Sequence, residues 1–258
     1  MSPRQLERIM PWAVIAIVLL AWEATCVAFA IQEFVLPRPS AVVVSIVKRA
    51  EALAWHALHT FYTTMLGFAL AVVGGALLGA MVGSSRLLYK GFYPLLVGFN
   101  SIPKVAVVPV LVIWFGIGTV PAIITAFLVS FFPVTVNVAT GLATLEPELE
   151  DVLRALGASR RDILLKVGIP RSLPYFFASL KVAITLAFIG SVISETIASN
   201  EGIGYLILAA SARFDVPLVF AALTVIAVMG IAMYAIFAVI EGRMTHWATR
   251  KLDYPMGG

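Results

Sequence analysis

Long apolar runs divide this sequence, and its polar residues gather in the segments between them. Six runs are long enough to cross a membrane, at residues 10–31, 60–83, 92–115, 120–142, 175–197 and 217–240. A hydrocarbon core about 30 Å thick needs about 20 residues of helix at a rise of about 1.5 Å per residue. The runs lack the alternating pattern of barrel strands, so they predict an all-α polytopic membrane protein with six transmembrane helices.

Composition supports a membrane location. Hydrophobic residues make up 61% of the 258 residues and charged residues only 12%, whereas a soluble domain carries about 25% charged residues. So few charges cannot cover a water-soluble globule, and a net charge of +4 on such a chain does not indicate nucleic acid. Cys26 is the single cysteine, so no disulfide can form within the chain.

The first run resembles a signal peptide in two respects. Arg4 and Arg8 precede it, and Ala28-Phe29-Ala30 resembles a cleavage site. The run is nevertheless as long as a membrane span and exceeds the apolar core of a signal peptide. We therefore expect it to remain as the first transmembrane helix.

The loops differ strongly in Lys and Arg content, which predicts orientation. With six spans both termini share one side, and that side has twelve basic residues against four on the other. The twelve are Arg4, Arg8, Arg86, Lys90, Arg154, Arg160, Arg161, Lys166, Arg171, Arg243, Arg250 and Lys251; the four are Arg38, Lys48, Arg49 and Arg213. Both termini are therefore predicted to be cytoplasmic.

Between the first two spans, a stiff extended stretch at 36–40 precedes a mixed segment at 41–59. Leu53, Ala57 and Phe61 share one helical face there, which predicts an interfacial helix on the outer surface. We divide the chain into an N-terminal span with this outer segment (1–59), a transmembrane core (60–241) and a cytoplasmic tail (242–258).

The cytoplasmic loop at 144–173 has complete helix-capping signals. Pro147 suits the first turn of a helix, and Gly157 suits a left-handed C-cap. Ser159 with Asp162 forms a capping box that opens a second helix. Pro170 and Pro174 are expected to keep this second helix from running straight into the next span. The pattern predicts two short helices joined by a rigid turn.

The same loop resembles the EAA loop of ABC import permeases. That motif reads Glu-Ala-Ala, three residues, Gly, nine residues, Ile, any residue, Leu-Pro; here Asp151-Val-Leu-Arg-Ala-Leu-Gly157 is followed by nine residues and Val167-Gly-Ile-Pro170. Asp151 replaces Glu, and apolar residues replace the two Ala, the Ile and the Leu. Charge sign and apolarity are kept.

Further strings are similar to the nitrate, sulfonate and taurine branch of these permeases. They are Trp22-Glu23, Leu36-Pro-Arg-Pro-Ser40, Ser101-Ile-Pro-Lys-Val-Ala106, Pro109, Val112-Ile-Trp-Phe-Gly-Ile-Gly118 and Gly202-Ile-Gly-Tyr-Leu206. The resemblance implies a type I importer of the bacterial inner membrane, with two copies of this chain, two cytosolic ATPase subunits and an extracytoplasmic solute-binding protein. It also implies a non-catalytic subunit without a cofactor of its own, because ATP and Mg²⁺ bind to the ATPase partner.

The sequence itself also indicates that another subunit hydrolyses ATP. No GxxxxGK[ST] phosphate-binding string occurs in the sequence, so energy must come from another polypeptide through an exposed element. The resemblance assigns the ATPase contact to the loop 147–170, above all to Asp151, Val152, Leu153, Arg154, Ala155, Leu156, Gly157, Ala158 and Ser159.

Polar residues within the spans are candidates for the translocation pathway. Lys104 lies between Pro103 and Pro109, which can break the helix, and with Asn100 and Ser101 it could face an anionic solute. Alternatively, Lys104 pairs with a carboxylate or snorkels to the interface. Glu195 could gate the pathway or touch the docked binding protein; the alternative is a hydrogen-bonded contact between helices.

Other polar or small residues have structural readings. Glu23 is expected to have a structural partner, and His56 with His59 lacks the further ligands that zinc needs. Gly67, Gly74, Gly75, Gly79 and Gly83 form a stripe that predicts close helix packing, within the subunit or between two copies.

Two rival functions remain. A secondary transporter or channel would not need the cytoplasmic loop, so deleting residues 148–159 would discriminate it from an importer subunit. An integral membrane enzyme would need a cluster of catalytic residues, which the sequence does not display.

Overall fold

The computed structural model describes residues 3–143 and 147–245, and it is helical without strands over these residues. The elements are α1 (Pro3–Ala28), α2 (Pro39–Lys48), α3 (Ala50–Gly83), α4 (Arg86–Asn100), the 3₁₀ helix η1 (Lys104–Val107), α5 (Val108–Phe115), α6 (Thr119–Ala143), α7 (Pro147–Ala155), α8 (Arg160–Ile163), the π-helix η2 (Leu164–Gly168), α9 (Ile169–Ala198), α10 (Ile203–Ser211) and α11 (Val216–Met244). The predicted all-α class is confirmed. Most of the predicted tail, residues 246–258, lies outside the described residues.

Six apolar segments correspond to the six predicted spans. Five are single helical segments long enough to cross a membrane: Ile9–Ala28, Ala50–Gly83, Thr119–Ala143, Arg161–Ala198 and Val216–Met244. The sixth is a broken pair, Leu87–Asn100 with Lys104–Phe115, bent by 73°. Pro103 is extended at the break (φ −64°, ψ 101°), because proline cannot continue the hydrogen-bond ladder of α4.

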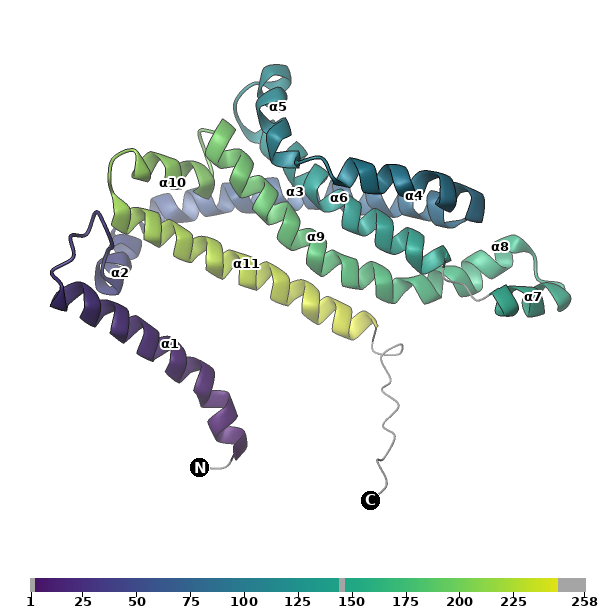
Figure 1. Cartoon of the computed structure of the whole chain (residues 1–258), viewed down its shortest axis with the longest axis horizontal. Helices are drawn as coiled ribbons and strands as arrows, with labels where there is room; N and C mark the ends of the chain where they lie inside the picture. The colour runs from purple at the N-terminus through teal and green to yellow at the C-terminus, as the bar shows by residue number, and fades with distance from the viewer. Residues whose placement is uncertain (1–2, 144–146, 246–258) are drawn as a thin grey trace.

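The centre of the molecule is formed by α3, α6 and α9, which pack along much of their length (Figure 1). The glycine stripe of α3 makes this approach possible. A Cβ atom built on Gly67 would lie 2.5 Å from Ala126 Cβ, and one on Gly79 would lie 2.6 Å from the Thr135 carbonyl oxygen. Most of the stripe therefore packs within the subunit, against α6.

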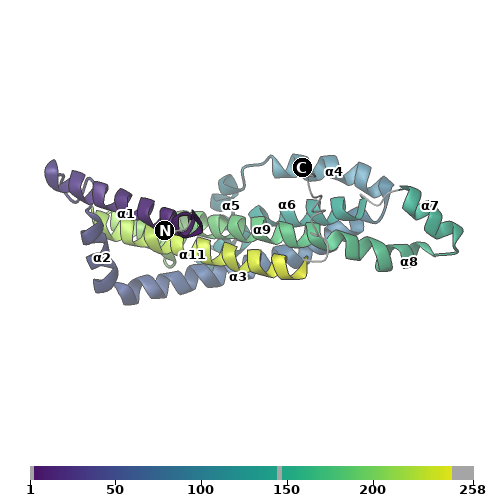
Figure 2. The same ribbon diagram turned by 90° about the horizontal axis from the view of Figure 1, so that it is seen from below.

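The two ends of the molecule are formed by different elements. In both views, α2 lies at one end while α7 and α8 project at the other (Figures 1 and 2). At the α2 end, α10 packs on α9 and α11. Figure 1 shows α1 apart from the central helices and α4 with α5 along the opposite side.

The outer segment differs from the predicted single interfacial helix. The chain breaks at Arg49 (φ −119°, ψ 25°), and residues 50–59 form the first turns of α3 rather than a separate element. Leu53 is buried and Ala57 packs with it in a cluster with α10 and α11, whereas Phe61 is 44% exposed. Tertiary contacts with α10 and α11 decide which side of this segment is covered, and hydropathy alone did not reveal them.

Candidate functional site

The first candidate element is α7 with the turn that follows it. Gly157 has φ +85°, and the turn has two nested hydrogen bonds, from Gly157 N–H to the Arg154 carbonyl (2.9 Å) and from Ala158 N–H to the Leu153 carbonyl (3.0 Å). These are the bonds of a Schellman motif, which satisfies the last carbonyls of a helix. The predicted glycine C-cap is confirmed.

Of the predicted capping box that opens α8, the Ser159 N-cap is present, while Asp162 bonds the Ser159 hydroxyl instead of its backbone N–H. The Asp162 N–H donates to Ser159 Oγ (3.1 Å), and Ser159 Oγ lies 2.5 Å from Asp162 Oδ2. Lys166 Nζ pairs with Asp162 Oδ1 at 2.8 Å one turn later. The turn between α7 and α8 is therefore held from both sides.

The path from α8 into the membrane differs from the prediction. Pro170 and Pro174 do not interrupt the chain, because α8, η2 and α9 follow one another without a gap. In η2 the Ile169 N–H bonds the Leu164 carbonyl, a π-type step that shifts the hydrogen-bond ladder directly before Pro170, which has no N–H to donate. The loop is thus joined to α9 by continuous helix.

The outward side of α7 is partly apolar. Val152 is 57% exposed, Leu156 is 79% exposed, and Asp151 is exposed beside them. Among the described elements α7 contacts only α8. An exposed apolar patch on a rigid, projecting element is typical of an interaction surface.

At the broken span, the structure brings Lys104 and Asn100 together. Lys104 Nζ donates to the Asn100 backbone carbonyl and to Asn100 Oδ1 (2.7 Å), and Ser101 Oγ donates to the Val97 carbonyl (3.1 Å). Within residues 3–143 and 147–245, Lys104 forms no ion pair with a carboxylate. Neutral oxygens therefore hold the ammonium group, and its charge is not neutralised by the described part of the chain.

Glu195 lies elsewhere, fully buried among α3, α9 and α10. Its Oε2 is 2.8 Å from the Thr60 hydroxyl and accepts from the Gly204 N–H at 3.3 Å. Its Oε1 is 3.1 Å from the Thr63 hydroxyl and 3.4 Å from the Ser191 hydroxyl. The interhelical contact considered for Glu195 is therefore present, whereas a role in the pathway stays a prediction.

Two histidines of α3 extend this network. His56 Nδ1 accepts from the Gly202 N–H (3.1 Å), and His59 Nε2 lies 3.1 Å from Glu201 Oε2 and 3.2 Å from the Thr119 hydroxyl. Both rings thus bind the chain's own polar groups. Positions 56, 59, 60 and 63 are separated by intervals of three and four and therefore share one face of α3. This spacing was a signal in the sequence for the polar network, and sequence reasoning did not use it.

The turn before α10 is shaped to fit the carboxylate. Gly202 has φ +97°, and a Cβ atom there would overlap the Glu195 carboxyl group. A Cβ on Gly204 would overlap the Val192 carbonyl. The Gly-Ile-Gly string is therefore explained by close approach to α9.

Comparisons with known proteins agree with these features. Residues 71–246 match the family described as "Binding-protein-dependent transport system inner membrane component". The chain is 29% identical to the formylaminopyrimidine transport permease protein ThiX of Halalkalibacterium halodurans, over 96% of this chain and 99% of that one. It is 30% identical to the riboflavin transport system permease protein RibX of Chloroflexus aurantiacus, over 90% and 87%.

Sulfonate and nitrate permeases are also among the relatives. The putative aliphatic sulfonates permease SsuC of Bacillus subtilis is 27% identical over 90% of this chain and 85% of its own length, and the nitrate permease NrtB of Synechococcus elongatus is 32% identical over 55% and 51%. The fold is similar to a chain of the MetNI methionine ABC transporter in an inward-facing conformation, with a TM-score of 0.60 and 18% identity over 76% of this chain and 95% of that chain.

Proposed function

The chain belongs to the family of binding-protein-dependent transport system inner membrane components, in the branch with nitrate and sulfonate permeases, and we propose that separate ATPase subunits drive it through the loop 147–170. It would take a small polar or anionic solute from an extracytoplasmic binding protein. Two copies of the chain and two ATPase subunits would form the importer, with both termini cytoplasmic.

The observation that carries this proposal is the projecting α7. It is capped at its C-terminus by Gly157, exposes Val152 and Leu156, and touches only α8 among the described elements. A rigid helix with an unpartnered apolar side is suited to dock on another protein. Because the sequence lacks a phosphate-binding loop, that protein is expected to be the ATPase.

Continuity between the loop and the span supports the direction of coupling. Motion of α7 would pass through the capped turn to α8 and η2, and from there into α9 without a flexible break. Since α9 packs on both α3 and α6, a displacement of the loop would act on the centre of the subunit. Alternating access driven by ATP binding is the mechanism we infer from this path.

The solute class is supported by Lys104. Its ammonium is bound by neutral oxygens at a broken span, and an uncompensated cation at membrane depth favours an anionic or strongly polar partner. Relatives named for nitrate, aliphatic sulfonates, riboflavin and formylaminopyrimidine are consistent with small polar solutes. We therefore assign Asn100, Ser101 and Lys104 to the pathway, with Glu195 as a second candidate.

Replacement of Leu156 tests the coupling proposal. A charge on this apolar side chain is expected to weaken docking, so Leu156→Glu should greatly reduce co-purification of the ATPase subunit with a tagged permease. Leu156→Met is the matched control, because it keeps the volume and apolarity. Both variants are checked by size-exclusion chromatography for intact folding. Full recovery of the ATPase with Leu156→Glu would show that α7 is not the docking element.

A further inference from the structure

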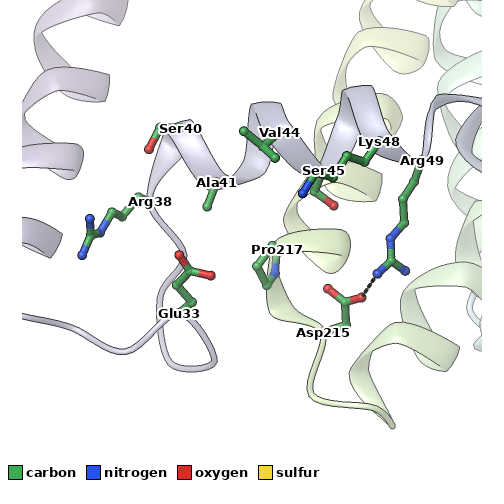
Figure 3. A pocket seen from close by; sticks show the side chains of 10 residues that line it. All are labelled: Glu33, Arg38, Ser40, Ala41, Val44, Ser45, Lys48, Arg49, Asp215 and Pro217. Carbon is green, nitrogen blue, oxygen red and sulfur yellow. Dashed lines mark ion pairs between the residues drawn. The ribbon is translucent and has the colours of Figure 1, made fainter.

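A groove of about 420 Å³ runs along one face of α2, at the end of the molecule opposite α7 (Figure 3). One wall consists of Ala41, Val44, Ser45 and Lys48, which recur at three and four and so share a helical face. The connection from α1, the first turn of α2, the α2–α3 junction and the start of α11 form the rest of the lining. Those residues are Glu33, Arg38, Ser40, Arg49, Asp215 and Pro217.

Positive charge is in excess in this groove. Arg38, Lys48 and Arg49 line it together with Glu33 and Asp215, and Arg49 pairs with Asp215 at 2.7 Å; Figure 3 shows the Arg38 guanidinium directed away from the other lining side chains. As far as the structure describes the chain, Arg38 and Lys48 form no ion pair, and Arg38 Nε is buried with no hydrogen-bond partner. A buried polar group without a partner is unfavourable, so an external acceptor is expected.

The positions of these cations are informative. Only four basic residues are predicted on this side of the membrane, and three of them line this one groove. The N-terminus of α2 is already satisfied, because Glu23 of α1 accepts from the Ser40 N–H (3.0 Å) and hydroxyl (2.7 Å). The groove therefore lies beside the outer end of α1. Arg38, which directly precedes α2, also interacts electrostatically with Glu23, whereas Lys48 lies at the other end of α2.

Exposed apolar side chains surround the same groove. Val43 and Val47 of α2 are 58% and 71% exposed, and Phe34 and Val35 in the connection are also exposed. Away from α2, α1 and α11 diverge (Figure 1), and almost all of the α1 span is uncovered by the rest of the chain. Cations beside apolar side chains at one level are typical of the boundary between headgroups and acyl chains.

We propose that this groove binds the anionic headgroup of a membrane phospholipid. The phosphate would lie at Lys48 and the Ser45 hydroxyl, with acyl chains along α1 and α11. Arg38 lies about 15 Å away along α2, so it would bind a second phosphate, which favours a headgroup with two phosphates. An acidic surface of a soluble partner would satisfy the cations but not the apolar side chains. The proposal needs only the membrane location and not the transport function.

The test measures lipid binding to the full chain purified in neutral detergent, by titration followed with native mass spectrometry. Probes are cardiolipin with two phosphates, phosphatidylglycerol with one, and zwitterionic phosphatidylcholine. Each cation near a membrane surface contributes about 1 kcal/mol, so Lys48→Gln and Arg38→Gln should each weaken cardiolipin binding about fivefold. Arg213→Gln is the matched control, since Arg213 is exposed at the same end but does not line the groove.

The expected order of affinity is cardiolipin, then phosphatidylglycerol, then phosphatidylcholine, with Arg213→Gln unchanged. Equal binding of the three lipids, or equal weakening by Arg213→Gln, overturns the site. Unchanged lipid binding in both groove variants also overturns it. If the same variants then abolish the stimulation of ATP hydrolysis by a soluble binding protein in the assembled importer, the groove belongs to that partner instead. Because Lys48 is exposed, Lys48→Gln should fold even if Arg38→Gln does not.

Discussion

Replacement of Glu195 is the most direct probe of the buried network between α3, α9 and α10. Glu195→Leu introduces an apolar side chain of similar size and removes every acceptor atom. Glu195→Gln keeps the shape and one acceptor oxygen. That oxygen can face the Gly204 N–H, while the amide donates to the hydroxyls of Thr63 and Ser191, which are able to accept.

The loss of stability depends on which of the groups that donate to Glu195 can bond another acceptor instead. The hydroxyls of Thr60 and Thr63 can turn to the carbonyls of His56 and His59, each 3.2 Å away. Such a hydroxyl loses only the extra strength of a bond to a charged group, about 1 kcal/mol. The Gly204 N–H bonds only the carboxylate, and leaving it unpaired costs about 1–3 kcal/mol. Relief of the desolvated charge offsets part of this, so Glu195→Leu should destabilise by about 2–4 kcal/mol and Glu195→Gln by about 1 kcal/mol or less.

Thermal unfolding of the purified chain in detergent measures the difference. By the scaling for chains of this size, Glu195→Leu should lower the midpoint by roughly 4–16 °C. Glu201→Gln is the control. Its carboxylate contacts His59, as does Glu195, whose Oε1 lies 3.8 Å from His59 Nδ1, but Glu201 is half-exposed, where an ion pair contributes about 0–1 kcal/mol. If Glu195→Leu melts no lower than Glu195→Gln, the hydrogen bonds do not stabilise this end of the molecule and the reasoning is refuted.

Three further predictions use the same kind of comparison. Gly79→Ala places a Cβ 2.6 Å from the Thr135 carbonyl oxygen and should destabilise the fold by about 1–3 kcal/mol. Gly74→Ala, whose Cβ would be 3.5 Å from its nearest neighbour, should leave the unfolding temperature unchanged or raise it. Gly157→Ala and Gly116→Ala both force alanine into positive φ with open space around the Cβ, which should destabilise the fold by about 1–2 kcal/mol each. Only Gly157→Ala should reduce co-purification of the ATPase. Equal loss of the ATPase in both variants would show that the turn at Gly157 has no special role. Lys104→Met should lower uptake of an anionic solute in reconstituted vesicles, and unchanged uptake would remove Lys104 from the pathway.

Sequence alone determined the features that depend on neighbouring residues. Six spans follow from apolar runs, because insertion into lipid depends on the sum of side-chain hydropathies along one segment. The C-cap at Gly157 and the N-cap at Ser159 follow from hydrogen bonds that close within a few residues. These are local events, so their residue types and spacing were sufficient to predict them.

Tertiary structure decided which polar groups meet. Thr60 and Glu195 are 135 residues apart and come together only because α3 and α9 pack in one particular rotation. Arg49, at the break between α2 and α3, likewise pairs with Asp215, which lies far away along the chain. In an apolar helix nearly every side resembles the others, so sequence predicts that it enters the membrane, while close packing determines which of its polar residues face a partner.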